Sequence, residues 1–504
     1  MKIMKKEIIK YSRVMLIGIL MITAWSCNEF LEETDQSNFT LENYFTRPEH
    51  ATSVVNSIYE SLRPVKASGF GGGPWMMLEF ATGLANTELG QAQNSLFVRN
   101  LINNSDNDYG QTYWTSSYRG IANANLAIEK IPEIDMDNAA QNKLLGEARF
   151  FRAYYYFNLI RIFGNIPLIT TSIDLTSPEL YPEPASTEAV YNQIVADLEV
   201  AENSGLPWRD VSGRVSMGAV KSLLSSVYLT MAGYPMQGGS QYYQLAAEKA
   251  NDVIQSGVFG LFDSYEKLHS VEDKNLGEHI FMTQYAAFTV PSSWQVSIIP
   301  YNRGISAYSA ETGGIFANQE FVESFEDGDK RAEEKEFFYT SYSLESDRTT
   351  TMELGDYYIW KHFDEEAQLN TTSSGLNWPL YRYAEILLTY AEASNEASGP
   401  TAEAYEAVNL VRRRANLPGL SGLSQQEFRE AVWRERWVEL CFENKTWYDM
   451  VRLRKAFNVN TLEFEDYVGH TFSYGPTLKE RELLFPIPTA EIRNNDKLTQ
   501  NTGY

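Results

Sequence analysis

Two pairs of short helices, each joined by a turn that contains glycine and proline, are the feature that most restricts how this chain can fold. Residues 219–232 and 242–255 form the first predicted pair, and residues 381–397 and 402–415 form the second. Small residues fall where the two helices of a pair would cross, so the backbones can approach closely. This layout is typical of tetratricopeptide-type repeats of about 34 residues, and generic helical hairpins are the alternative.

Three further segments carry apolar residues at the 3.6-residue period of a helix, namely residues 51–63, 139–163 and 187–203. Gly164 directly follows the second segment and is expected to end it. Thr187 is in place to cap the third segment. The scaffold of the protein is therefore predicted to be all-α.

Long stretches without periodicity separate the predicted helices, at residues 66–118, 262–378 and 457–484. The second stretch contains short strand-like runs, of which residues 280–285 are one. Long loops on a compact helical scaffold usually carry function. We therefore expect helical hairpins with long irregular insertions and minor short strands, and we expect the function to lie in the insertions.

The first 26 residues have the pattern of an export signal. Basic residues open the chain, an apolar run covers residues 14–25, and Ser26 precedes Cys27. The apolar run is too short to act as a membrane-spanning helix. A cysteine directly after a small residue predicts a bacterial lipoprotein in which Cys27 carries the lipid, and ordinary secretion with an incidental cysteine is the alternative. The mature protein is thus expected to be anchored to a membrane by lipid.

The charge and aromatic content of the chain restrict the class of ligand, and its cysteine content restricts the disulfides that it can form. The chain has 66 Asp and Glu against 42 Lys and Arg, for a net charge of −24, so nucleic acid is a poor ligand. Aromatic residues make up 13% of the chain, which suits neutral ligands that stack on rings, and sugars are the obvious class. If Cys27 carries lipid, Cys441 has no disulfide partner, and we expect it in the core on the apolar stripe of a helix.

Motifs for catalysis or metal binding are missing from the sequence. The five histidines form no H-E-x-x-H pair, and there is neither a C-x-x-C pair nor a G-x-S-x-G elbow. Glu435 and Glu439 are one helical turn apart, but Arg434 and Arg436 beside them favour an ion network on a helix surface over a catalytic acid pair. We therefore predict no catalytic residue, no metal and no cofactor.

Aromatic residues in the irregular stretches are the candidate ligand contacts. They are Trp75, which follows a glycine-rich run, and Trp294, Tyr301 and Tyr308, which surround Arg303 in one loop. The apolar face of a pyranose ring packs on an exposed aromatic plane, while polar side chains nearby bind the hydroxyls. The alternative is that these rings cover the core beneath the loops.

Several segments, taken in order along the chain, together resemble one protein family. They include GEARFFRAYYYF at 146–157 and WPLYRYAEILL at 378–388, with further matches at 27–32, 113–125, 163–168, 213–224, 435–440, 484–488 and 498–504. The whole set is similar to the SusD/RagB family of outer-membrane nutrient-binding lipoproteins. The resemblance covers nearly the whole of the chain after residue 26.

This resemblance implies a scaffold of four tetratricopeptide-like helix pairs with loops on one face. It also implies a lipid-anchored protein in the outer membrane that faces outwards and caps a SusC-like TonB-dependent transporter. Ligand contacts in the family come largely from the loops that correspond here to residues 66–118 and 285–310, in agreement with the aromatic candidates. Helix residues such as Arg149 and Arg152 would then belong to the scaffold.

The predicted organisation is a signal peptide at 1–26, an N-terminal region at 27–260 and a C-terminal region at 261–504, the last two forming one compact domain. The predicted function is the binding of oligosaccharides and their delivery to the transporter, without catalysis. Uptake of peptides by a protein of the same type is the main alternative. An α-helical glycoside hydrolase and a scaffold that binds only protein are the others.

Overall fold

The computed structural model describes residues 44–67, 73–88, 93–174, 176–177 and 180–504. Residues Arg47–Tyr504 form one compact unit. The predicted signal peptide and Cys27 lie outside the described residues.

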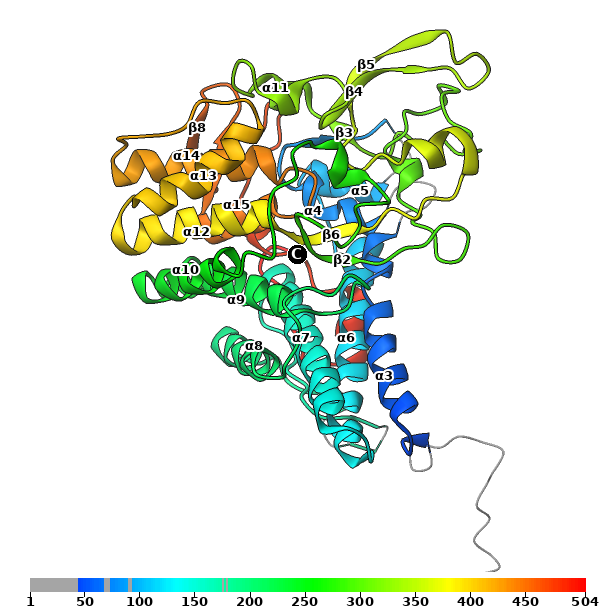
Figure 1. Ribbon diagram of the computed structural model, residues 1–504, viewed down its shortest axis with the longest axis vertical. Helices are drawn as coiled ribbons and strands as arrows, with labels where there is room; N and C mark the ends of the chain where they lie inside the picture. Colours follow the sequence, from blue (N-terminus) through cyan, green and yellow to red (C-terminus); the bar gives the residue numbers. More distant parts are fainter. Residues whose placement is uncertain (1–43, 68–72, 89–92, 175, 178–179) are drawn as a thin grey trace, which may run out of the picture. The chain divides into compact units, whose positions relative to one another are not determined.

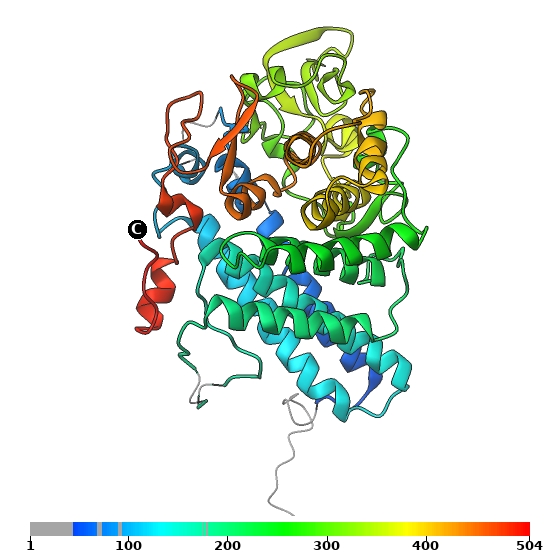
Figure 2. The ribbon, with the colours of Figure 1, turned by 90° about the vertical axis from the view of Figure 1, so that its left-hand side faces the viewer.

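Antiparallel helices packed in successive pairs make up the N-terminal half of this unit (Figures 1 and 2). Asp137 caps the longest of them by accepting the N–H of Ala140 at 2.9 Å, and Gly164, at φ +73°, ends it. Ser186 caps the helix that begins at Thr187, whereas the sequence analysis expected Thr187 itself to be the cap. The helices are α3 (Pro48–Glu60), α6 (Asp108–Lys130), α7 (Asn138–Phe163), α8 (Thr187–Glu202), α9 (Met217–Ala232) and α10 (Ser240–Gln255).

A second helical group forms the C-terminal part, and α12 packs on α10 to join the two groups. Ser424 and Glu427 form a capping box at the start of α14. Among the described residues, no helix combines the length and apolar character needed to cross a membrane. The helices of this group are α12 (Tyr383–Ser398), α13 (Ala402–Arg414), α14 (Gln425–Glu439) and α15 (Thr446–Leu453).

Short antiparallel sheets lie between and beside the helices. One sheet has the strand order β1-β3-β5-β4, and its β4–β5 hairpin projects at the upper right of Figure 1; β2 pairs with β6, and β7 with β8. The strands are β1 (Ala85–Asn86), β2 (His279–Thr283), β3 (Phe316–Ala317), β4 (Phe338–Ser343), β5 (Thr351–Ile359), β6 (Trp378–Arg382), β7 (Lys455–Asn458) and β8 (Glu463–Asp466). The remaining short α-helices of the described residues are α4 (Met77–Phe80), α5 (Gln93–Arg99), α11 (Gln319–Glu323) and α16 (Thr489–Asn494).

The mainly helical fold and both predicted hairpins are confirmed, since α9 pairs with α10 and α12 with α13. The expectation that residues 66–118 are irregular is wrong in part, because α6 begins at Asp108.

Glycine and asparagine in α6 serve packing: a Cβ at Gly120 would lie 2.2 Å from the Tyr155 ring. Asn125 donates to the carbonyls of residues 169 and 171 at 3.0 Å each.

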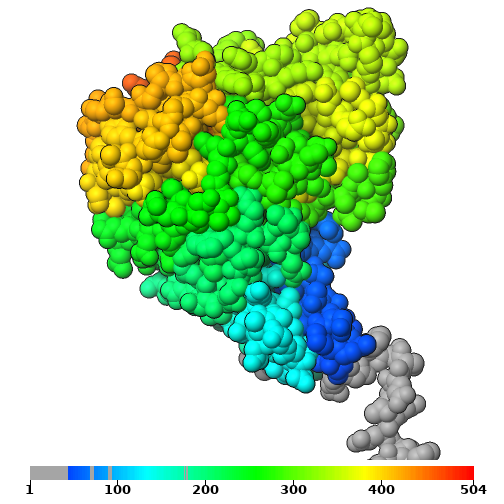
Figure 3. All heavy atoms as spheres, in the orientation of Figure 1, coloured from blue at the N-terminus to red at the C-terminus, as the bar shows by residue number. Residues whose placement is uncertain are grey.

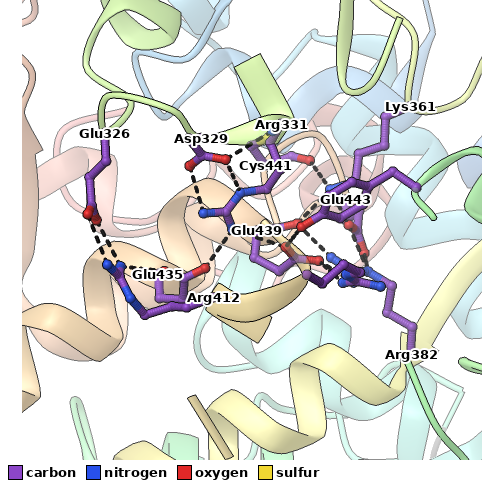
Figure 4. A network of polar contacts seen from close by, with 12 residues as sticks. Glu326, Asp329, Arg331, Lys361, Arg382, Arg412, Glu435, Glu439, Cys441 and Glu443 are labelled. Carbon is purple, nitrogen blue, oxygen red and sulfur yellow. Dashed lines mark hydrogen bonds and ion pairs between the residues drawn. The ribbon is translucent and has the colours of Figure 1, made fainter. Parts of the chain in front are cut away.

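A buried network of charged side chains joins the C-terminal helices to the middle of the chain (Figure 4). At its centre the Glu439 carboxylate, which has no exposed surface, meets three guanidinium groups. Arg382 and Arg414 each lie 2.6 Å from it and Arg331 lies 3.0 Å away. Three cations around one carboxylate hold the end of α14 against β6, α13 and the segment that precedes β4.

Further carboxylates complete the network. Arg382 also binds Glu278 at 2.7 Å and Glu443 at 2.8 Å, and Lys361 pairs with Glu443 as well. Arg331 binds Glu435 at 2.6 Å. Because these groups are removed from water, each depends on its partners to offset the cost of desolvation.

Two sequence-based interpretations need correction here. Glu435 and Glu439 do belong to an ion network, but the network is in the core and not on a helix surface. Cys441 is a buried free thiol, as expected, yet it follows the end of α14 at Glu439 and so is not part of a helical stripe. The i, i+4 pattern shows a shared face but cannot show which face is buried.

Replacing Arg382 by alanine is expected to lower the free energy of unfolding by about 3–5 kcal/mol, because Glu278, Glu439 and Glu443 would lose a buried partner. Urea unfolding followed by tryptophan fluorescence measures this. The control is Arg413→Ala, which breaks a pair with Glu406 whose side chains are 51% and 59% exposed, and should cost less than about 1 kcal/mol. Equal effects of the two substitutions would contradict the role given to the network.

Acid should destabilise the protein in a defined range. Burial alone would raise the pKa of Glu443, but Arg382 and Lys361 outweigh it and hold the pKa at about 2. A carboxyl pKa that is lower in the folded than in the unfolded state contributes stability above the unfolded value, and this is lost as the pH falls through the folded value. The free energy of unfolding should therefore fall between about pH 4.5 and about pH 2. Glu443→Gln should remove part of that fall, and an unchanged pH profile would refute the assignment.

Candidate functional site

Much of the segment between β2 and β6 lies on one side of the molecule, although Glu326 of this segment pairs with Arg412 of α13. In Figure 3 this segment, coloured green to yellow, occupies the upper right, while α12 and α13 lie at the left. It holds the loop with Trp294, Tyr301, Arg303 and Tyr308. We call residues 286–290, 301–312 and 356–358, together with Glu88, the loop face; Phe288, Tyr301 and Arg303 are exposed on it, whereas Tyr358 is buried.

Glu88 ties the N-terminal part of the chain to this loop. Its carboxylate accepts the Tyr358 hydroxyl at 2.6 Å, the Arg303 guanidinium at 3.1 Å and the backbone N–H of Tyr301 at 2.5 Å. Its own N–H donates to the carbonyl of Gly313 at 2.9 Å. A single acidic side chain thus fixes the positions of Tyr301 and Arg303.

A second carboxylate shapes the turn that follows. Glu311 accepts the N–H groups of Gly304 at 2.6 Å, Ile305 at 2.7 Å and Ser306 at 2.9 Å. Farther along, Ser306 donates to the Gln368 side chain at 2.9 Å. These hydrogen bonds hold the loop in one conformation before any ligand arrives, which reduces the entropy lost on binding.

The predicted residues of this loop differ in exposure. Tyr301 is 49% exposed and Arg303 is exposed beside it, so both are available to a ligand, while Tyr308 is half-buried. Asp356 is half-buried close to them, and burial followed by the charge of Glu88 raises its pKa. An exposed ring, a guanidinium and carboxylates within one surface suit a ligand with a flat apolar face and many hydroxyls.

Phe288 is a further exposed aromatic residue that the sequence analysis missed. It is 74% exposed at the tip of a tight turn closed by two 2.9 Å hydrogen bonds between Ala286 and Val290. Its φ of +66° is rare for a bulky residue and costs about 1–3 kcal/mol. The strain lies in the backbone of the turn, and the exposed ring that it presents is a candidate contact for another molecule.

Trp75 and Trp294 do not lie on the loop face, which corrects the expectation that they present their rings to a ligand. Both are 0% exposed. Their ring centroids are 6.2 Å apart, and each also packs against Trp378, at 5.3 and 5.6 Å. His362 stacks on Trp378 at 4.3 Å. The four rings form a buried cluster beneath the loops. Trp75 and Trp294 therefore cover the core, which was the alternative interpretation of these residues.

The residues that were missed carry little signal in the sequence. Glu88 is one of 66 acidic residues, and its role depends on partners more than 200 positions away. Phe288 lies in the irregular stretch already singled out, and its place just before Val290-Pro291 resembles a turn. Burial of the tryptophans depends on β6, which brings Trp378 against both of them.

Within the described part of the chain, no three His, Cys, Asp or Glu side chains come together as ligands for a metal ion. His269, His279 and His362 are buried, and burial lowers their pKa values to about 4, 4 and 3, so they are neutral at pH 7. They act as core residues, with the His362 ring packed in the tryptophan cluster.

Comparison with known proteins identifies the class to which this fold and loop face belong. Residues 282–504 match the family described as the SusD family, and residues 29–229 match one described as "Starch-binding associating with outer membrane". SusD-like protein P2 of Formosa agariphila is 28% identical over 96% of this chain and 98% of its own length. The second description names starch binding, and these matches agree with the prediction that the protein is not an enzyme.

Solved structures give the same result. A SusD superfamily protein from Parabacteroides distasonis is 40% identical, with a TM-score of 0.88 over 93% of this chain and 100% of that chain. Surface glycan-binding protein A from Bacteroides thetaiotaomicron, solved in complex with laminarihexaose, shares the fold at 20% identity, with a TM-score of 0.72 over 90% of this chain and 100% of that one. The chain belongs to the SusD family, which confirms the resemblance seen in its motifs.

The placement of the aromatic residues predicts effects on stability of very different size. Trp294→Ala removes a fully buried ring and should lower the free energy of unfolding by about 3–5 kcal/mol. Tyr301→Ala removes a half-exposed ring and should cost less than about 1 kcal/mol. Chemical unfolding of the two variants measures both, and a small effect of Trp294→Ala would contradict the buried cluster.

Proposed function

We propose that this protein is a cell-surface lipoprotein that binds an oligosaccharide and delivers it to a SusC-like TonB-dependent transporter. The lipid attached to Cys27 would anchor it to the outer membrane, facing outwards. Family membership and the export signal support the location and the transporter. Binding of sugar rests on the loop face.

The observation that carries the proposal is the pairing of Tyr301 with Arg303. The Tyr301 ring is 49% exposed, and Glu88 holds both its backbone N–H and the Arg303 guanidinium. A sugar ring stacked on Tyr301 would find donors in Arg303 and acceptors in Glu88 and Asp356 within the same surface. Tyr308, half-buried in the same loop, would line the edge of this sugar site.

Phe288 supplies a second aromatic contact. A groove of about 850 Å³ opens beside it, with Trp360 and Phe363 among its lining residues and stacked 4.4 Å apart. Carboxylates line the same groove, among them Glu334, Glu365 and Glu366. Hydroxyls of an extended glycan can donate to such groups, whereas an anionic glycan would be repelled.

Affinity electrophoresis in native gels tests the proposal. Purified protein should be retarded by at least one neutral polysaccharide, with laminarin, starch and galactomannan as the first probes. Release of reducing sugar is measured on the same samples and is expected to be nil. Retardation by polygalacturonate or alginate should be weak, because of the carboxylates on the loop face.

Variants then locate the site. Tyr301→Ala and Phe288→Ala should each weaken binding about tenfold, since each removes a stacking surface. Tyr181→Ala is a matched control, because Tyr181 is 50% exposed and lies between α7 and α8. Binding that survives both substitutions, or that Tyr181→Ala reduces equally, would contradict the site, and a protein retarded by no glycan but bound by peptides would support the alternative ligand.

A further inference from the structure

A cleft on another part of the molecule has the opposite charge. It lies between the C-terminal end of α7, the end of α15 and the last residues of the chain, and has a volume of about 440 Å³. Arg161, Arg452, Arg454 and Arg481 line it, and among the described residues Glu480 is the one carboxylate that does. In a chain with a net charge of −24, this gathering of arginines calls for a physical reason.

Two of the arginines are fully engaged by the fold. Arg452 binds Glu392 at 2.5 Å and Asp449 at 2.8 Å. Arg481 binds Glu482 at 2.6 Å and donates to the carbonyl of Gly503 at 3.0 Å. Their charges are balanced locally, so they shape the cleft without needing a further partner.

Arg161 is held in place but not neutralised. Its guanidinium lies 3.5 Å from the centroid of the Tyr448 ring, and it donates to the carbonyl of Phe157 at 2.9 Å and to Asn158 at 2.8 Å. No described carboxylate lies within ion-pair distance of it. The stacking and the neutral acceptors fix the orientation of the group without pairing its positive charge, and the group lines the cleft.

Of Arg161 and Arg454, Arg454 has the fewer hydrogen-bond partners. Its Nη1 atom is buried and has no hydrogen-bond partner among the described residues, and the guanidinium lies 5.0 Å from the centroid of the Tyr234 ring. Its backbone has φ +55° at the end of α15, a conformation uncommon for residues other than glycine. A buried donor left without an acceptor costs about 1–3 kcal/mol, and more when it is charged.

Neutralisation by loss of a proton does not remove this cost. Burial lowers the pKa of Arg454 below its ordinary 12.5, while Tyr467, Tyr234 and Glu480 raise it in part. A guanidinium nevertheless keeps its proton in proteins. Glu480, the nearest source of negative charge on the cleft, is exposed and forms no ion pair with Arg454 within the described residues.

We propose that this cleft binds a compact oxyanion, namely a carboxylate, sulfate or phosphate group, with Arg454 as the hydrogen-bonding residue and Arg161 as a second source of positive charge. Nη1 of Arg454 is buried, so the side chain would turn toward the cleft to donate to two oxygens of such a group at once, as a planar guanidinium can. A volume of about 440 Å³ lies within the range of small-molecule sites, so the group can belong to a free ion or to an acidic sugar. This site is separate from the loop face and does not rest on glycan binding there.

Thermal unfolding of the full-length protein tests the proposal. Phosphate, sulfate and glucuronate are each titrated at constant ionic strength against chloride, with glucose as the uncharged counterpart of glucuronate. A saturable rise in Tm with an oxyanion, absent with glucose, is expected. Saturation by phosphate and sulfate but not glucuronate would assign the site to a free ion, and saturation by glucuronate would extend it to acidic sugars.

Variants separate the cleft from general ion effects. Arg454→Met should abolish the saturable rise, while Arg413→Met, at an exposed arginine paired with Glu406, should retain it. Glu480→Gln removes an exposed negative charge that would repel a bound anion, and it should tighten phosphate binding about two- to five-fold. This second variant keeps the test valid if Arg454→Met folds poorly. The absence of a saturable effect in the wild type, or one unchanged by both Arg454→Met and Glu480→Gln, would overturn the proposal.

Discussion

The contact between Glu439 and the guanidinium groups of Arg331, Arg382 and Arg414 is the constraint on which the C-terminal half of the structure depends. It joins the end of α14 to the end of α13, to β6 and to the segment before β4. Hydrophobic packing alone would hold these elements together but tolerate sliding between them. Buried ion pairs with fixed geometry specify one arrangement, because any shift would leave a charge without a partner.

This rigid interior explains how a helical scaffold can support long loops. β6 runs from Trp378 in the tryptophan cluster to Arg382 in the charge network, so the same strand supports the loop face and anchors it to the helices. Above it, Glu88 and Glu311 hold the loop by accepting backbone N–H groups. These hydrogen bonds fix the position of Tyr301, and the turn between Ala286 and Val290 fixes that of Phe288, so both exposed rings need little rearrangement to bind.

Much of the fold could be predicted from the sequence because helical period is a local property. The hairpins at α9–α10 and α12–α13 match their expected bounds within two residues at each end. Burial of a loop residue is not local: in the sequence Trp75 and Trp294 resemble exposed ligand contacts, and only the fold shows that β6 packs Trp378 against both. Tyr301 and Arg303 are exposed as a contact requires, but Glu88, which positions them, could not be distinguished among many acidic residues.

The central claim is that the exposed rings of the loop face, and not the buried tryptophans, contact the sugar. A crystal structure of the protein with an oligosaccharide of the polysaccharide that retards it most in native gels tests this directly. The account predicts a sugar ring stacked on Tyr301 or Phe288, hydroxyls within hydrogen-bond distance of Arg303, Glu88 or Asp356, and an unchanged tryptophan cluster. Sugar bound away from the loop face, or a cluster that opens to place Trp75 or Trp294 against the ligand, would contradict it.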